Sequence, residues 1–285
     1  MDVEKIRVAA VQFNSKIGDK ERNIAKAVEL LEKVGREKVD VSAVPDYFST
    51  GNVITKENIK NWAEPIPGPT TDRLADVARE FNMCIVGGGI VENEGGKFYC
   101  TSPLLDRKGT LIGKYRKVNF WAGPPMDEAG SGLTAGTDYP VFKIEGTTIG
   151  MLLQVDIDFP EPARILGLKG AEIFFWMTSV DYAWIDVCRF LAKAYAFNNL
   201  AYIVTVNTTG MQEGLGYFGE STIVNPLGEV ISSAGTSYGT YGLFPEGMAI
   251  AEVDLGLVRG LRAQLRPFER IKRAPLSLLT EKKEA

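Results

Sequence analysis

Short segments rich in β-branched and aromatic residues alternate with amphipathic helical segments, and this alternation restricts the fold more than any other feature of the chain. Residues 6–13 (IRVAAVQF) have the composition of a buried strand. Residues 21–35 follow, with Ile24, Val28 and Leu31 spaced to share one face of a helix. Repetition of this pattern, ending in segments typical of hairpins, predicts a layered α/β protein.

The remaining segments continue the alternation into the second half of the chain. We predict further strands over residues 39–45, 84–91, 99–106, 141–144, 148–156, 173–177 and 202–207, helices over 71–81, 160–169 and 184–198, and antiparallel strands over 221–225, 229–232 and 248–253. No Pro/Gly/Ser-rich linker and no low-complexity segment interrupts them. We therefore predict a single domain over residues 1–285, with an extended tail over about residues 265–285.

The overall composition is that of a globular protein that neither binds polyanions nor crosses a membrane. The formal net charge is −4, so no basic surface for nucleic acid or anionic lipid is expected. No apolar run approaches the roughly 18 residues that a spanning helix needs. The N-terminus lacks a basic, apolar leader, and the three cysteines are odd in number and widely spaced. We therefore predict a cytoplasmic protein.

The chain contains no histidine, which excludes several kinds of catalytic site at once. Ser-His-Asp triads, Cys-His pairs, HExxH zinc sites and proton transfer by imidazole all require that side chain. No CxxC pair is present either, so the usual structural zinc sites are excluded. Any catalysis would depend on carboxylates, lysine, tyrosine or cysteine.

Seven short motifs occur in order across nearly the whole chain. They are IRVAAVQFN with GDKERN (6–14 and 18–23), PDYFSTG (45–51), PGPTTDRLADVAREF (67–81), KYRKVNFW (114–121), TAG (134–136), IGMLLQVDIDFPEPAR (149–164) and GESTIVNPLGEV (219–230). Each motif is weak alone. Together, in this order and at this spacing, they resemble the nitrilase (carbon–nitrogen hydrolase) superfamily.

The resemblance implies a fold, an assembly and a chemistry. The implied fold is a four-layer α-β-β-α sandwich, which usually pairs through its helical faces into dimers or larger homo-oligomers. The implied chemistry is that of a Glu-Lys-Cys triad, often with a second Glu. The thiolate attacks a nitrile or amide carbon, Glu acts as base and acid, Lys stabilises the oxyanion, and water releases the acyl-enzyme. No metal or organic cofactor is implied.

The triad of the family is only partly present in this sequence. Lys117, in Tyr-Arg-Lys-Val, matches the lysine of the family. Asp46 stands where the base is normally Glu, and Gln154 stands where Cys normally begins a CxDxxFPE pattern. The second Glu corresponds best to Glu128, with Asp127 as the alternative because the loop length varies in this region. The resemblance thus places a site at these residues with both the nucleophile and the base substituted.

These substitutions oppose catalysis by the thiol mechanism. A glutamine amide has no proton whose removal would make it a usable nucleophile, and it is suited to hydrogen bonding instead. Loss of the nucleophile in a comparable covalent hydrolase costs roughly 10⁶-fold in kcat. Asp46 is one methylene shorter than Glu, and a misplacement of about 1 Å costs on the order of 10²-fold. The missing nucleophile is therefore the larger effect.

Other residues offer weaker routes to catalysis. Asp156 lies two positions after Gln154, but we interpret it as a local hydrogen-bond acceptor that holds the turn. Cys100 and Cys188 are more typical of small core residues than of nucleophiles. Direct attack by water, with Asp46 as base, would be slow.

Two hypotheses follow from the sequence. The first is a non-hydrolytic pseudoenzyme that binds a small polar ligand, such as an amide, carboxylate or amino acid, or that serves as a structural or regulatory subunit. The alternative is an amidase or nitrilase that works slowly or by an altered mechanism. Asp46 and Lys117 could equally form a buried ion pair without further function, or line a retained pocket.

Overall fold

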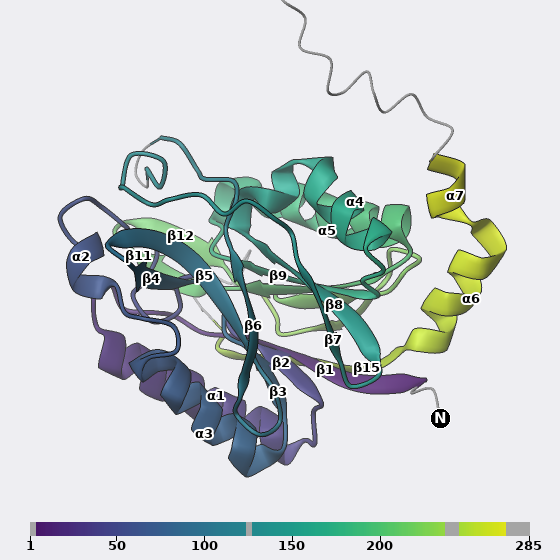
Figure 1. Cartoon of the computed structure of the whole chain (residues 1–285), viewed down its shortest axis with the longest axis horizontal. Coiled ribbons are helices and arrows are strands. Elements are labelled where there is room, and N and C mark those ends of the chain that lie inside the picture. The colour runs from purple at the N-terminus through teal and green to yellow at the C-terminus, as the bar shows by residue number, and fades with distance from the viewer. Residues whose placement is uncertain (1–3, 124–126, 237–244, 272–285) are drawn as a thin grey trace, which may run out of the picture.

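The computed structural model describes residues 4–123, 127–236 and 245–271 of the chain. In these residues two β-sheets pack face to face, and a pair of helices covers the outer face of each sheet (Figure 1). The predicted four-layer α-β-β-α arrangement is therefore confirmed.

The first sheet forms around the strand predicted at the start of the chain. Its order is β15 (Gly247–Asp254), β1 (Lys5–Gln12), β2 (Val41–Ala43), β3 (Cys84–Val86), β5 (Lys97–Leu105) and β4 (Ile90–Glu94), with β6 (Leu111–Arg116) also paired to β5. Side chains of β1 alternate between two cores. Val8 faces the second sheet, whereas Ala9 and Val11 face α1 (Lys20–Arg36) and α3 (Pro69–Phe81).

The second sheet contains parallel strands at its centre and antiparallel strands at its edges. Its order is β14 (Val230–Ser233), β13 (Thr222–Val224), β10 (Tyr202–Asn207), β9 (Ile173–Thr178), β8 (Thr147–Leu153) and β7 (Val141–Ile144). The outer face packs against α4 (Pro160–Leu168) and α5 (Ile185–Asn199) through buried side chains such as Leu166 and Ala196. The central strands are buried on both faces, which explains their continuous apolar sequences.

The predicted strand over residues 84–91 is wrong, because the chain divides it into β3 and β4. Glycines occupy the three positions between these strands, and Gly88 has a φ of +44°. A Cβ atom at Gly88 would overlap the carbonyl oxygen of Pro45, and one at Gly89 would overlap Asp46 Oδ1. These glycines therefore let two loops approach each other at the position of Asp46.

The predicted strand over residues 148–156 also ends early. Strand β8 stops at Leu153, and a 3₁₀ turn (Gln154–Asp158) leads into α4. Gln154 has a φ of +41°, in the left-handed region that non-glycine residues rarely adopt. This elbow turns the Gln154 side chain out of the alternation of the strand.

Several smaller elements were not predicted from the sequence. They are α2 (Ile59–Trp62), β6, the hairpin of β11 (Thr209–Gln212) and β12 (Leu215–Phe218), and α6 (Leu255–Leu265). The extended tail expected from about residue 265 begins instead with a short helix, α7 (Pro267–Ile271), and residues 272–285 lie outside the described part of the chain. None of the helices in the described ranges has the length and apolar character required to cross a membrane.

Candidate functional site

Asp46, Lys117, Glu128 and Gln154 come together between the ends of several strands. Asp46 follows β2, Lys117 follows β6, and Gln154 follows β8. Each of the four side chains is buried or nearly so. The structure thus brings together all the positions that the family resemblance selected. We refer to Asp46, Lys117 and Glu128 as the buried charge cluster.

Lys117 and Glu128 form the shortest ion pair of this cluster. Lys117 Nζ lies 2.6 Å from Glu128 Oε1 and 2.8 Å from Oε2. The carboxylate also accepts hydrogen bonds from the Tyr47 hydroxyl (2.7 Å) and the Trp121 amide (2.9 Å). Burial alone would lower the pKa of Lys117, but the nearby carboxylates of Glu128 and Asp46 outweigh it and raise that pKa above its ordinary value. The lysine is therefore a fixed cation.

Glu128, and not Asp127, supplies this carboxylate. Asp127 lies nearer the surface, where its Oδ1 accepts a hydrogen bond from the Gly130 amide at 3.0 Å. Of the two acidic residues that the sequence left open, Glu128 is the one that contacts Lys117.

Asp46 is held more loosely than Glu128. Its Oδ1 accepts from the Tyr47 amide (3.0 Å) and lies 3.5 Å from Cys100 Sγ. Its Oδ2 is 3.6 Å from Lys117 Nζ and has no hydrogen-bond donor among the described residues. Burial raises the pKa of Asp46 to about 7, although the charge of Lys117 opposes this shift. The Asp46 carboxyl group therefore gains and loses its proton near neutral pH.

The Gln154 carboxamide completes the group. Its Oε1 accepts from Lys117 Nζ at 3.0 Å, and its backbone carbonyl accepts from Trp176 Nε1 at 2.9 Å. None of the described residues accepts a hydrogen bond from its Nε2. The side chain thus satisfies the lysine on one side and keeps a donor available on the other.

A cavity of about 170 Å³ adjoins Gln154, and we call it the Gln154 cavity. Its walls include Trp121, Asp158, Trp176, Ser179, Asp181 and Trp184. Gln154 is part of this lining, whereas no member of the buried charge cluster is. Because the members of the cluster are 0–3% exposed, Gln154 separates them from the space that a ligand could occupy.

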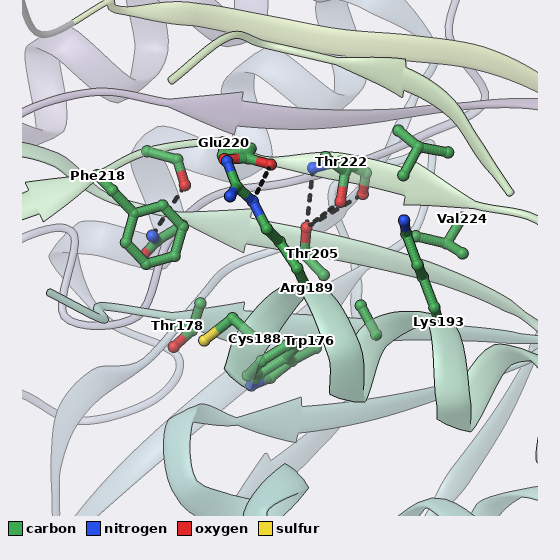
Figure 2. Close-up of a pocket in the computed structure, with 14 residues that line it drawn as sticks. Trp176, Thr178, Cys188, Arg189, Lys193, Thr205, Phe218, Glu220, Thr222 and Val224 are labelled. Atoms are coloured by element: carbon green, nitrogen blue, oxygen red, sulfur yellow. Dashed lines mark hydrogen bonds and ion pairs between the residues drawn. The ribbon is translucent and has the colours of Figure 1, made fainter. Parts of the chain in front are cut away.

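A second cavity of about 130 Å³ lies beyond Trp176 and Cys188, which line both spaces (Figure 2). There Arg189 forms a bidentate ion pair with Glu220 at 2.8 and 2.7 Å. The Thr178 hydroxyl is buried and has no hydrogen-bond partner within the described ranges. This second cavity does not include Gln154, so it is separate from the site that the sequence predicted.

Asp156 holds the elbow, as its interpretation from the sequence requires. Its Oδ2 accepts from the Leu153 amide (2.9 Å) and the Tyr115 hydroxyl (2.5 Å), and its Oδ1 accepts from the Asn119 amide (3.1 Å). The carboxyl group is fully buried. It is therefore a structural acceptor that fixes the turn beginning at Gln154.

Neither cysteine near the site is activated. Cys100 is fully buried, and burial together with Asp46 raises the pKa of its thiol well above the ordinary value. Burial and the carboxylates of Asp158 and Asp181 raise the pKa of Cys188 to about 12. Since the thiolate is the nucleophilic form, both thiols are poor nucleophiles at neutral pH.

Some residues of the site could not be selected from the sequence. Tyr47 and Trp121 lie near Asp46 and Lys117 in the sequence, but their hydrogen bonds to Glu128 follow from no sequence pattern. Asp158 lies in the motif at 149–164 and Asp181 lies in none of the seven motifs, and no spacing rule places them at one cavity. In the described portion of the chain, no three acidic or cysteine side chains have the arrangement that a metal ion needs.

Comparison with known proteins identifies the family of the chain. The carbon–nitrogen hydrolase family matches residues 7–263. A nitrilase from Pyrococcus abyssi is 32% identical over 263 residues, which cover 90% of this chain and 93% of that protein. The omega-amidase NIT2 of Xenopus tropicalis is 30% identical, with 98% of this chain and 99% of that protein covered.

Solved structures share the fold at lower sequence identity. A carbon–nitrogen hydrolase from Helicobacter pylori G27 has a TM-score of 0.87 and 20% identity, covering 98% of this chain and 99% of that one. Nit3 of Saccharomyces cerevisiae, a member of the nitrilase superfamily, has a TM-score of 0.81 and 23% identity, with coverages of 95% and 97%. From the match over residues 7–263 and its relatives, the chain belongs to the carbon–nitrogen hydrolase family, the nitrilase superfamily.

Proposed function

We propose that the protein is a non-hydrolytic member of this family that binds a small polar ligand in the Gln154 cavity. The observation that carries the proposal is the position of the Gln154 carboxamide, between the buried charge cluster and the cavity. In this proposal Gln154 occupies the place of the nucleophilic cysteine, and Asp46 the place of the catalytic glutamate.

The chemistry of the side chains supports binding over turnover. Acyl transfer needs a nucleophile within reach of the substrate, activated by a base. The carboxamide of Gln154 cannot attack a carbonyl carbon under these conditions, because it has no proton that a carboxylate base could usefully remove. Cys100 does not line the cavity, and the thiol of Cys188 lies among carboxylates that disfavour its thiolate.

A slow hydrolase acting through a water molecule on Asp46 is the alternative. The raised pKa of Asp46, about 7, would suit a general base. However, Asp46 is 1% exposed and does not line the cavity, so a bound substrate would not meet a water molecule held there. We therefore prefer binding.

A solved structure of an amidase illustrates the covalent step that this chain lacks in our proposal. In a mutant of the amidase from Nesterenkonia sp. AN1, the acetamide moiety of fluoroacetamide is added covalently at the active-site cysteine; that chain has a TM-score of 0.74 and 22% identity to this one. Our proposal is that this chain retains the family's pocket and lacks that covalent step. A role as a structural or regulatory subunit is compatible with it.

We also propose that the protein forms a homo-oligomer, a dimer or larger, in the cytoplasm. Aromatic side chains on and beside the outer helices are exposed, including Phe190 (69%), Phe197 (55%) and Phe159 (48%). An apolar face of this kind is typical of a protein–protein contact. All three cysteines are free, which suits a reducing compartment.

Release of ammonia from simple amides, nitriles and N-carbamoyl compounds tests the proposed function. We expect release at the rate of the buffer alone, together with saturable quenching of tryptophan fluorescence by some of these compounds, because three indoles line the cavity. Hydrolysis well above background that is abolished by Asp46→Ala would contradict the proposal. Asp127→Ala is a matched control, since this neighbouring carboxylate caps a surface turn.

A further inference from the structure

Among the described residues, the lining of the Gln154 cavity carries negative charge and no positive charge. Asp158 and Asp181 both line it, and no described lysine or arginine does. Asp181 accepts a hydrogen bond from the Ala183 amide at 2.8 Å, and Asp158 has no hydrogen-bond donor among the described residues. Neither carboxylate forms an ion pair with a described lysine or arginine. The pocket therefore presents two carboxylates with which a cationic ligand can pair.

Burial raises the pKa of the Asp158 carboxyl group, and the positive charge of Lys117 opposes this rise only in part. Lys117 is fully buried behind Gln154 and is already paired with Glu128 at 2.6 Å and with Asp46 at 3.6 Å. By contrast, the second cavity contains its own cations, Arg189 and Lys193 (Figure 2). Of the two cavities, only the Gln154 cavity has an excess of negative charge in its described lining.

Indole rings add a second feature that favours cations. Trp121 and Trp184 meet edge to face with their ring centroids 5.8 Å apart, and Trp176 lines the same space. The face of an indole attracts an ammonium group within about 6 Å, and the attraction grows when water is excluded. Aromatic walls beside carboxylates are therefore complementary to an organic cation.

The inner end of the cavity, at Gln154, favours a hydrogen-bond acceptor and not a cation. There the Gln154 Nε2 is a hydrogen-bond donor without an acceptor among the described residues. A carbonyl oxygen of a ligand would satisfy it. The two ends of the pocket thus select for different groups on one small molecule.

We infer that the Gln154 cavity binds a small aliphatic amine that also carries a carboxamide or similar carbonyl group. The carbonyl oxygen accepts from Gln154, and the ammonium group lies between the indoles and the carboxylates of Asp158 and Asp181. This inference rests on the proposed function, binding without turnover, and it adds the charge of the ligand.

Three probes that share a carboxamide and differ in charge at the other end provide the test. They are 4-aminobutanamide (cationic), pentanamide (neutral) and succinamate (anionic), titrated by calorimetry and by tryptophan fluorescence, with ammonia release measured in parallel. We expect the cationic probe to bind most tightly and succinamate most weakly. Equal or tighter binding of pentanamide or succinamate would overturn the inference.

Charge-neutralising variants test which carboxylates bind the ammonium group of the ligand. Asp158→Asn and Asp181→Asn should each weaken binding of 4-aminobutanamide about two- to fivefold, which is the range of a partly exposed ion pair, and leave pentanamide unchanged. Asp186→Asn is the matched control, because this carboxylate is 88% exposed, lies outside the cavity and pairs with Arg189. An equal loss of affinity for 4-aminobutanamide in Asp186→Asn would show that long-range electrostatics, and not contact within the cavity, governs binding. This result would overturn the inference.

The outcomes also separate this inference from the proposed function. Ammonia release from any probe overturns non-hydrolytic binding, whichever probe is preferred. Preference for the neutral or anionic probe without ammonia release overturns only the charge assignment. Absence of binding by all three probes contradicts both.

Discussion

Asp46 is a buried carboxyl group whose Oδ2 receives no hydrogen bond from the residues that the structure describes, whereas Glu128 beside it accepts several hydrogen bonds. Asp46 and Glu128 both interact with Lys117, and Glu128, which lies closer, interacts more strongly. The pKa of Asp46, raised by burial to about 7, follows from this unequal sharing. The ionisation of Asp46 should therefore affect stability in the neutral range.

We predict that the free energy of unfolding falls as the pH rises from 5 to 7 because of Asp46. Its folded pKa of about 7 exceeds the ordinary value of 3.8, so this contribution is complete below pH 3.8 and is lost as the pH passes through 7. The loss should be roughly 2 kcal/mol greater in the wild type than in Asp46→Asn. Urea unfolding at several pH values measures it; parallel pH profiles in the two proteins would contradict the assignment.

We predict that substitution of Gln154 can partly restore amide hydrolysis. Gln154→Cys with Asp46→Glu supplies a thiol beside a carboxylate of ordinary length and Lys117, so amide hydrolysis should rise above the wild-type level. Gln154→Cys alone should be slower than the double variant by about 10²-fold, the usual contribution of a well-placed base. Steady-state ammonia release measures both. A well-folded double variant without any gain would show that the pocket no longer accepts an amide.

At the scale of elements, hydrophobic periodicity was enough to predict most strands and helices. The predicted strand over 6–13 and helix over 21–35 agree with β1 and α1 to within a residue or two, because each has one or two clearly apolar faces. The break between β3 and β4 was missed, and the predicted strand over 148–156 ran past the elbow at Gln154, although a turn held by Asp156 was expected. Both depend on backbone conformations imposed by tertiary contacts, which periodicity does not report.

The glycine run between β3 and β4 gives a prediction at this scale. Gly89→Ala should destabilise the protein by about 1–3 kcal/mol, because its methyl group would overlap Asp46 Oδ1 and lie 2.8 Å from Cys100 Sγ. The cost should shrink in an Asp46→Ala background. Chemical unfolding of the four proteins of this cycle measures the coupling, and strict additivity would contradict it. Gly260→Ala, in open space on α6, is the control and should not destabilise.

At the scale of the whole molecule, the order of the layers could be predicted only from the family resemblance. Periodicity indicates which elements exist but not which sheet each strand joins. β15, for example, pairs with β1 rather than with the neighbouring β14. The positions of Asp46, Lys117, Gln154 and Glu128 came from the motifs, whereas the acidic cavity wall came only from the three-dimensional arrangement.

The exposed face of α5 gives a prediction about assembly. Phe190→Glu should convert a dimer or larger oligomer into smaller species, because it places a charge on an apolar face that is 69% exposed at this residue. Sedimentation velocity or light scattering after gel filtration measures the mass. Met211→Glu is the control, since Met211 is 51% exposed on β11, away from the outer helices. An unchanged mass in Phe190→Glu would contradict assembly through this face.

Binding without hydrolysis requires that no covalent intermediate forms at Gln154 or elsewhere in its cavity. Intact-mass spectrometry of the wild-type protein, quenched at short times during incubation with a large excess of a simple amide, would detect such an intermediate. We predict the unmodified mass at every time point, with Gln154→Cys, Asp46→Glu as the variant in which an acyl adduct can accumulate. An acyl-sized mass increase on the wild-type protein, mapped to any side chain of the Gln154 cavity, would contradict the account.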